Sequence, residues 1–210
     1  MRKINARLRR AHLDTVHGFV KAIEALDPYT RGHTDRVVHF VAVIGQELGL
    51  APDRMDRLHS AALLHDAGKL AVPAGLLRQA EPLTSTEEAV VVRHMRVVEG
   101  LLAEIDVLAP VVRLLEEAHR VAAGGRGSRE ARVLTAADAF DAMTSTRSYR
   151  AAVTQAEAFA QLRTRADALG ADVVEALIAG ITSRGEVYGS PDDASAAEVA
   201  RLVKERAVRA

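Results

Sequence analysis

The segment His65-Asp66-Ala67-Gly68-Lys69 places an imidazole beside a carboxylate at the end of an apolar run. Neutral imidazole and carboxylate groups are ligands that suit iron, manganese and zinc. An ionised carboxylate that is buried without a partner costs several kcal/mol, so the pair favours a bound cation. For these two residues alone, the alternative is a hydrogen-bonded pair at a helix end.

Further polar residues fall on the apolar stripes of separate predicted helices, where neighbours recur three or four positions apart. These residues are His33, His65, His94, His119 and Asp138. The stripes of two of them are defined by Leu101 and Ile105 for His94, and by Val112 and Leu115 for His119. A single such histidine is well explained as a hydrogen-bonded core residue. Repetition on five helices predicts a metal site inside a helical bundle, because so many imidazoles and carboxylates in one core require a cation.

The elements that position these residues are predicted to be helices, because apolar residues recur at helical spacing and alternating, strand-like runs are scarce. We therefore expect an all-α protein. The expected helices cover residues 4–26, 30–48, 52–69, 84–105, 110–122, 129–145, 155–169, 172–184 and 194–208. Thr84 with Glu87, or Ser85 with Glu88, forms a capping box at the start of one helix. Residues 72–75 and 124–128 contain turn-forming glycine and proline and are expected to be irregular.

The composition limits the classes of function. The 210 residues, of which 49% are hydrophobic, are enough for one core, and the 28 basic and 28 acidic residues give a net charge of +0. Without a global basic field, we expect no DNA binding and no attraction to an anionic membrane. The chain has no cysteine, no apolar run long enough to span a membrane and no signal-peptide core. These features predict a cytoplasmic protein.

Three regions are expected along the chain. Residues 1–26 form an N-terminal helix whose first half is rich in arginine, and this helix either pairs with a second copy as a homodimer or ends in solvent. Residues 27–185 form the domain that carries the candidate ligands, and residues 186–210 form a C-terminal helical tail. No sensor or DNA-binding segment is visible in the sequence.

Several short motifs together resemble a known family. They are DPYTRGH at residues 27–33, HDAGK at 65–69, LTSTEEAVVVRH at 83–94, ADAFDAMT at 137–144 and RSYR at 147–150. This set is similar to the HD superfamily of metal-dependent phosphohydrolases, and more closely to its bacterial HD-GYP branch, which hydrolyses cyclic di-GMP. The resemblance implies an HD-domain helical bundle with the metal site in its core.

The resemblance also implies roles for individual residues. The implied ligands of a two-metal centre are His65, Asp66, His94, His119 and Asp138, with Asp66 able to bridge both ions and His33 at the edge of the site. Lys69 would hold a phosphate oxygen or the attacking water, and Arg147 and Arg150 would bind the substrate phosphates. Iron or manganese is the expected divalent ion, and zinc, nickel and magnesium are compatible with the same ligands.

The chain departs from the HD-GYP pattern in the loop that gives the branch its name, HHExxDGxGYP. The second histidine is replaced by Arg120, and the acid, the tyrosine and the proline of that loop are missing from residues 120–129. Tyr29 stands where members with a third metal carry glutamate, which argues against three metals. A minimal centre needs His33, His65, Asp66 and Asp138, and all four are present.

Three functions fit these observations. The first is a phosphodiesterase in which a metal-activated water attacks a phosphodiester of a cyclic dinucleotide. The second is an inactive HD-GYP-like module that signals by binding a nucleotide or a partner. The third is a single-metal HD nucleotide phosphohydrolase, which would tolerate Arg120. The retained ligands favour the first, and the missing loop favours the second.

Overall fold

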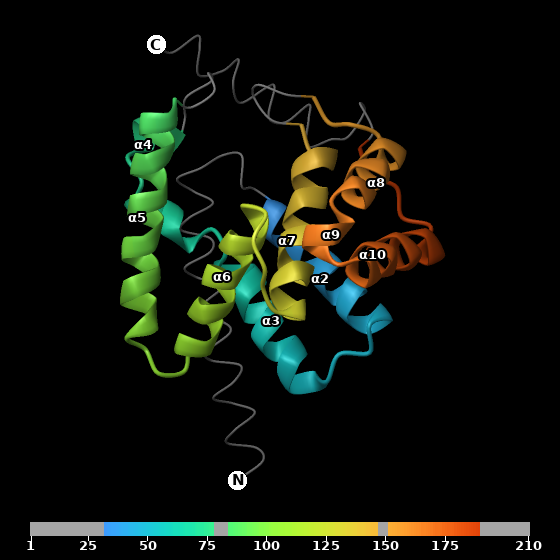
Figure 1. The fold of residues 1–210 in the computed structure, drawn as a ribbon, viewed down its shortest axis with the longest axis horizontal. Helices are drawn as coiled ribbons and strands as arrows, with labels where there is room; N and C mark the ends of the chain where they lie inside the picture. Colours follow the sequence, from blue (N-terminus) through green and yellow to red (C-terminus); the bar gives the residue numbers. More distant parts are fainter. Residues whose placement is uncertain (1–31, 78–83, 147–150, 190–210) are drawn as a thin grey trace.

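The computed structural model describes residues 32–77, 84–146 and 151–189, and within these ranges it contains helices and no strands (Figure 1). The helices are α2 (His33–Glu47), α3 (Pro52–Leu64), the 3-10 turn η2 (Ala67–Ala71), α4 (Ala74–Leu77), α5 (Ser85–Ala103), α6 (Ala109–Ala122), α7 (Arg129–Thr144), α8 (Gln155–Thr164), α9 (Ala166–Leu169) and α10 (Ala171–Arg184). The all-α prediction is confirmed. None of the described helices has the length and the apolar character needed to cross a membrane.

The centre of the bundle is the packing of α2 against α7, which lie side by side and also contact α3 and α10. Phe40 of α2 and Phe140 of α7 are fully buried, and their rings meet edge to face at 5.0 Å between centroids. Ala136 and Ala137 are also fully buried, and such small side chains allow close approach of the helices. This packing fixes the register between the helices that carry His33 and Asp138.

Most predicted helices agree with the structure within a few residues at each end. The irregular segment at 124–128 is confirmed, whereas residues 74 and 75 of the segment expected to be irregular at 72–75 begin the short helix α4. The helices expected over 4–26 and 194–208, with the homodimer contact assigned to the first, lie outside the described residues. The division into regions 1–26, 27–185 and 186–210 stays a prediction.

Two predicted helices are broken in the structure. The helix expected over 52–69 ends at Leu64, and the chain continues as the 3-10 turn η2, in which the Lys69 amide donates to the Asp66 carbonyl at 3.0 Å. Gly68, a weak helix former, is buried inside this tighter turn. The helix expected over 155–169 is divided at Arg165 into α8 and α9, a break that the apolar spacing does not reveal.

The start of α5 contains the capping box predicted at Thr84. The Thr84 hydroxyl accepts from the Glu87 amide, and the Glu87 carboxylate accepts from the Thr84 amide at 2.8 Å. We expect Thr84→Ala to lower the free energy of unfolding by about 1 kcal/mol, because the Glu87 amide in the first turn loses its acceptor. Urea unfolding tests this, with Thr86→Ala inside the same helix as the matched control. Equal losses in the two variants would contradict a capping role for Thr84.

Candidate metal centre

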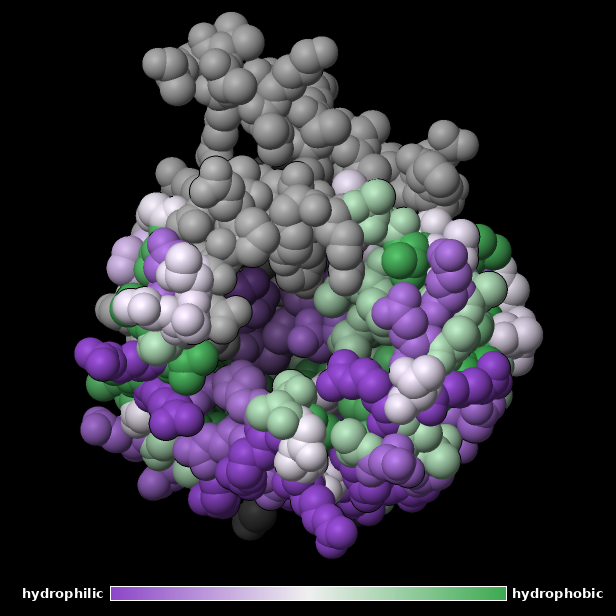
Figure 2. Space-filling model, turned by 45° about the horizontal axis from the view of Figure 1, so that its top comes forward, coloured by the Kyte–Doolittle hydropathy of each residue, from purple (hydrophilic) through white to green (hydrophobic). Residues whose placement is uncertain are grey.

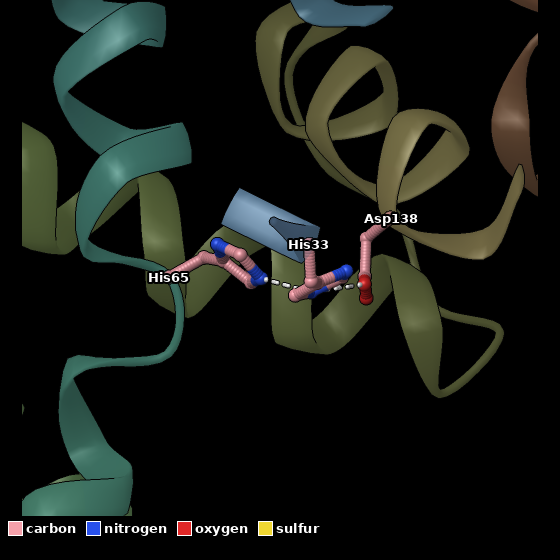
Figure 3. A group of neighbouring side chains, drawn as sticks. All are labelled: His33, His65 and Asp138. Atoms are coloured by element: carbon pink, nitrogen blue, oxygen red, sulfur yellow. Dashed lines mark hydrogen bonds and ion pairs between the residues drawn. The ribbon is translucent and has the colours of Figure 1, made fainter. Parts of the chain in front are cut away.

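Three side chains from three helical segments point toward one another, two of them largely buried and Asp138 46% exposed (Figure 3). His33 comes from the start of α2, His65 follows the last residue of α3, and Asp138 comes from α7. One ligand atom from each lies within 4.8 Å of the others. His33 Nε2 is 3.0 Å from His65 Nε2 and 3.5 Å from Asp138 Oδ1. The arrangement therefore brings two imidazole nitrogens and a carboxylate oxygen to one point.

Asp66 extends this group from the other side. Its Oδ2 lies 3.7 Å from Nε2 of both His33 and His65, and it accepts a hydrogen bond from Lys69 Nζ at 2.8 Å. Burial opposes ionisation of Asp66, but the charges of Lys69, His65 and His33 outweigh it and lower the pKa of this carboxyl far below its usual range. Asp66 is therefore an anion beside both imidazoles. Lys69 lies beside the centre, in contact with its candidate ligand Asp66.

The local backbone structure explains how each imidazole is oriented toward the site. Gly32 precedes α2 with a φ of 72°, a left-handed conformation that favours glycine, and it places His33 at the first helical position. His65 occupies the C-cap of α3, where its Nδ1 donates to the Ala62 carbonyl at 2.7 Å. The α3 face that ends at His65, comprising Leu58, Ala61 and Ala62, is fully buried as predicted. His33 is likewise buried, at 5% exposure, on its predicted stripe.

A second layer of polar residues holds His33. Asp141 of α7, itself 1% exposed, accepts from His33 Nδ1 at 2.6 Å. Arg36 donates to both Asp141 oxygens, at 2.5 and 3.1 Å, and to the Ser145 hydroxyl at 3.0 Å. Burial opposes ionisation of Asp141, but the hydrogen bonds from His33 and Arg36 lower its pKa. The carboxylate thus fixes the orientation of the imidazole.

Sequence reasoning gave no role to Asp141 or Arg36, although a signal was present. Asp141 follows Asp138 by three positions, and Arg36 follows His33 by three, so each shares a helix face with a predicted ligand. A charged residue one turn from a candidate ligand on the buried face indicates a partner for that ligand. The same spacing therefore identifies both residues once the ligands are known.

The hydrogen bonds show that these residues fit a divalent ion. A carbonyl and an ionised carboxylate only accept, so both histidines carry a proton on Nδ1, which leaves Nε2 of each facing the site. The two Nε2 atoms lie 3.0 Å apart beside two carboxylates, an arrangement that a shared proton satisfies in metal-free protein and that a divalent ion satisfies when bound. Two nitrogen and two oxygen donors suit Fe²⁺, Mn²⁺ or Zn²⁺. The predicted minimal set of His33, His65, Asp66 and Asp138 is thus brought together, with His33 central rather than at the edge.

The remaining predicted ligands are placed differently. His119 lies on α6 with 45% of its side chain exposed, and its Nδ1 is 3.1 Å from Glu99 of α5. The structure does not bring His119 into the group around His33. His94 lies on α5, but its side chain is outside the described residues, as are Arg147 and Arg150. Their roles stay predictions.

The prediction that His94 and His119 lie on buried apolar stripes is wrong in part. Leu101 and Ile105 are 60% and 48% exposed, because α5 packs on η2 and α6 at the side of the bundle and this stripe faces outward. On α6 the buried residues include Val112, Leu115 and Val121, and His119 lies beyond the edge of that face. Spacing alone did not identify which side of these helices is covered.

The charge environment of His33 leads to a pH prediction. Burial lowers the pKa of His33, but the hydrogen bond to Asp141 and the charges of Asp66, Asp141 and Asp138 raise it more, so the pKa lies above the ordinary 6.5. In metal-free protein, protonated His33 therefore stabilises the fold fully below pH 6.5, and this contribution is lost as pH rises through the folded-state pKa. Urea unfolding of chelator-treated protein should show stability falling above pH 6.5, a fall that is absent in His33→Gln. A stability that rises with pH only in the wild type would contradict this assignment.

The comparisons with known proteins agree with the site. Residues 19–173, most of the chain, match the family model described as HD domain. The chain is 33% identical over 147 residues to the 3'3'-cGAMP-specific phosphodiesterase 3 of Vibrio cholerae, covering 66% of this chain and 32% of that protein. It is 31% identical over 195 residues to the cyclic di-GMP phosphodiesterase response regulator RpfG of Xanthomonas campestris, covering 87% and 52%.

A third relative, the cyclic di-GMP phosphodiesterase of Thermotoga maritima, is 29% identical over 169 residues, covering 74% of this chain and 45% of that protein. The chain thus spans between about a third and a half of the length of these relatives. The family indicated by the sequence motifs is confirmed. On its extensive match to the family model, with His33, His65 and Asp138 grouped together and Asp66 beside the two imidazoles, the chain belongs to the HD domain family.

Proposed function

We propose that the protein is a metal-dependent phosphodiesterase that hydrolyses a cyclic dinucleotide, with cyclic di-GMP as the first candidate. The observation that carries the proposal is the convergence of His33, His65 and Asp138, with Asp66 beside them, on one point in the bundle. The printed names of the three relatives add support, because each is a phosphodiesterase of cyclic di-GMP or of 3'3'-cGAMP. Figure 2 shows a hydrophilic hollow on the face that is turned forward.

The residues of the site would have separate roles that suit phosphodiester hydrolysis. A divalent ion, when bound, lowers the pKa of water and neutralises charge that develops on phosphoryl oxygens. His33, His65, Asp66 and Asp138 would bind it, and Asp141 and the Ala62 carbonyl orient the two imidazoles. Lys69 donates to Asp66 at 2.8 Å, and its ammonium group is proposed to bind a phosphate oxygen. Arg147 and Arg150 are proposed to bind the substrate phosphates.

The number of bound ions distinguishes this proposal from the alternative, a single-metal nucleotide phosphohydrolase. Among the described residues, which do not include the His94 side chain, the donors group around one point, and His119 instead lies against Glu99, whose pKa is raised by burial. Together with Arg120 in place of a second histidine, this favours a single-ion centre over the two-ion centre that the family resemblance implies. A single-metal nucleotide phosphohydrolase is therefore the second candidate. Iron and manganese stay the proposed metals for both.

Turnover by protein purified without oxygen and reconstituted with Fe²⁺ or Mn²⁺ tests the proposal. The substrates are cyclic di-GMP, 3'3'-cGAMP and a set of mononucleotides, with products resolved by chromatography and Asp66→Ala as the control. We expect linear or mononucleotide products from a cyclic dinucleotide, and none from the control. Hydrolysis of mononucleotides alone would establish the second candidate. Absence of all turnover in folded, metal-loaded protein would contradict both and indicate a binding module.

A further inference from the structure

A cleft of about 780 Å³ lies between α5 and α6, and none of His33, His65 and Asp138 lines it. Part of its lining is apolar, formed by valine, glycine and alanine. The ionisable part consists of Arg96 and Glu99 from α5 and Glu116, His119 and Arg120 from α6. Pockets of about 300–1,000 Å³ with an apolar lining and a few polar groups hold small organic ligands. The size therefore suits a ligand as large as a nucleotide.

The two walls of the cleft are single faces of neighbouring helices, which stand next to each other in Figure 1. Arg96 and Gly100 are four positions apart on α5, and Glu116 and Arg120 are four positions apart on α6. All four residues are exposed, whereas Leu115 of α6 is buried in the bundle. The cleft is therefore open to solvent, and its charged side chains can reach a ligand without rearrangement of the core.

The two arginines of the cleft differ from its buried acid in their contacts. Glu99 is buried, and its Oε1 lies 3.1 Å from Nδ1 of His119. Arg96 and Arg120 make no hydrogen bond or ion pair with any residue in the ranges 32–77, 84–146 and 151–189. One guanidinium group on each wall is thus free to bind an anion, with all its donors unused by the described part of the chain.

Both walls of the cleft contact elements of the candidate metal centre. On one side, α5 packs on η2, which begins directly after Asp66 and carries Lys69. On the other side, α6 packs on α3 and α7, the helices that position His65 and Asp138. The cleft is therefore formed by the helices next to the metal centre.

We propose that Arg96 and Arg120 bind a phosphate group of a nucleotide in this cleft, with one guanidinium from each wall. Guanidinium groups donate paired hydrogen bonds that match the oxygens of a phosphate. The proposal rests on the proposed function, because a cyclic dinucleotide has a second phosphodiester besides the one that reacts at the metal. That second phosphate and the phosphate of a separate nucleotide share the chemistry that the two arginines recognise.

Isothermal titration of the chelator-treated full chain with cyclic di-GMP and with GMP measures binding without turnover. We expect Arg96→Gln and Arg120→Gln each to raise the Kd by about tenfold, because each removes a charge-assisted contact. Glu116→Gln should lower the Kd, because it removes a negative charge that repels the phosphate in the same cleft. Arg113→Gln is the matched control, since Arg113 is exposed on α6 and lines a different pocket. Circular dichroism establishes that each variant is folded.

The two ligands distinguish the two sources of the phosphate. A phosphate of the substrate predicts weaker cyclic di-GMP binding in both arginine variants, and a KM in metal-loaded protein that rises by a larger factor than kcat falls. A separate nucleotide predicts weaker GMP binding, with the KM for cyclic di-GMP at the wild-type value.

Two results would overturn the site. One is a wild type that binds neither ligand, and the other is equal affinity of the wild type, Arg96→Gln and Arg120→Gln for both ligands. Failure of the proposed function is distinguishable from these results. A protein that hydrolyses no cyclic dinucleotide, but loses affinity for GMP in both arginine variants, would contradict the proposed function and support the site.

Discussion

The His65→Ala variant is expected to lose cyclic di-GMP hydrolysis by at least about a thousandfold. The change removes the Nε2 that faces His33 Nε2 at 3.0 Å, and with it one of two nitrogen donors of the candidate centre. Activation of water and neutralisation of phosphoryl charge by a bound ion supply several kcal/mol, and each 1.4 kcal/mol corresponds to a factor of about ten in rate. Initial rates with Mn²⁺-reconstituted wild type and variant measure the loss.

Two other histidines provide matched controls for this variant. His39 lies on the exposed side of α2, where it pairs with Glu186 at 2.8 Å, and His39→Ala should keep the wild-type rate within a few-fold. His119→Ala distinguishes a single-ion centre from a two-ion centre. The variant should keep its activity if His119 is not a ligand and lose it if His119 binds a second ion. Turnover in His65→Ala close to that of the wild type would contradict the assigned centre.

The second large effect is expected at Asp141. Asp141→Ala removes the carboxylate that joins His33 to Arg36 and leaves two cationic or proton-donating groups facing a cavity in the bundle. Breaking a buried pair by removal of one partner costs about 3–5 kcal/mol, because the remaining charge is uncompensated. We expect a decrease of that order in the free energy of unfolding of chelator-treated protein, measured with urea at pH 7.

The conservative variant Asp141→Asn separates stability from ligand positioning. Its amide oxygen can still accept from His33, so the fold should lose less stability than in the alanine variant. The weaker acceptor makes His33 a poorer ligand, and metal affinity should fall by about 10–100-fold. Isothermal titration with Mn²⁺ measures this decrease. Unchanged stability in Asp141→Ala, together with unchanged affinity in Asp141→Asn, would show that the contacts to His33 and Arg36 are dispensable.

A ligand of the metal centre could be predicted where a polar residue lies on an apolar stripe that another helix is certain to bury. On α2, Val37 and Phe40 continue the face of His33, and on α3 the fully buried Leu58 and Ala61 continue the face of His65. Both helices lie in the middle of the bundle and pack against each other. An apolar stripe there is buried, so the polar residue on it points into the core.

The same reasoning failed for helices at the side of the bundle. Apolar residues lie on more than one face of α5. Its exposed Val97 and Leu101 are four residues apart, which is also the spacing between residues of a buried stripe. The sequence contains no local signal for which face meets η2 and α6. The break after Leu64 was also missed, because a helix that ends in a 3-10 turn keeps nearly the same spacing of apolar residues.

The central claim is that His33, His65, Asp66 and Asp138 bind a divalent ion. Electron paramagnetic resonance of Mn²⁺ added to chelator-treated protein tests it most directly, because bound Mn²⁺ differs from free Mn²⁺ and shows coupling to imidazole nitrogen. The account predicts at least one bound ion per chain with nitrogen coupling, and loss of both signals in His65→Ala. A folded wild type that leaves all Mn²⁺ free, and also takes up no Fe²⁺ or Zn²⁺ by elemental analysis, would contradict it.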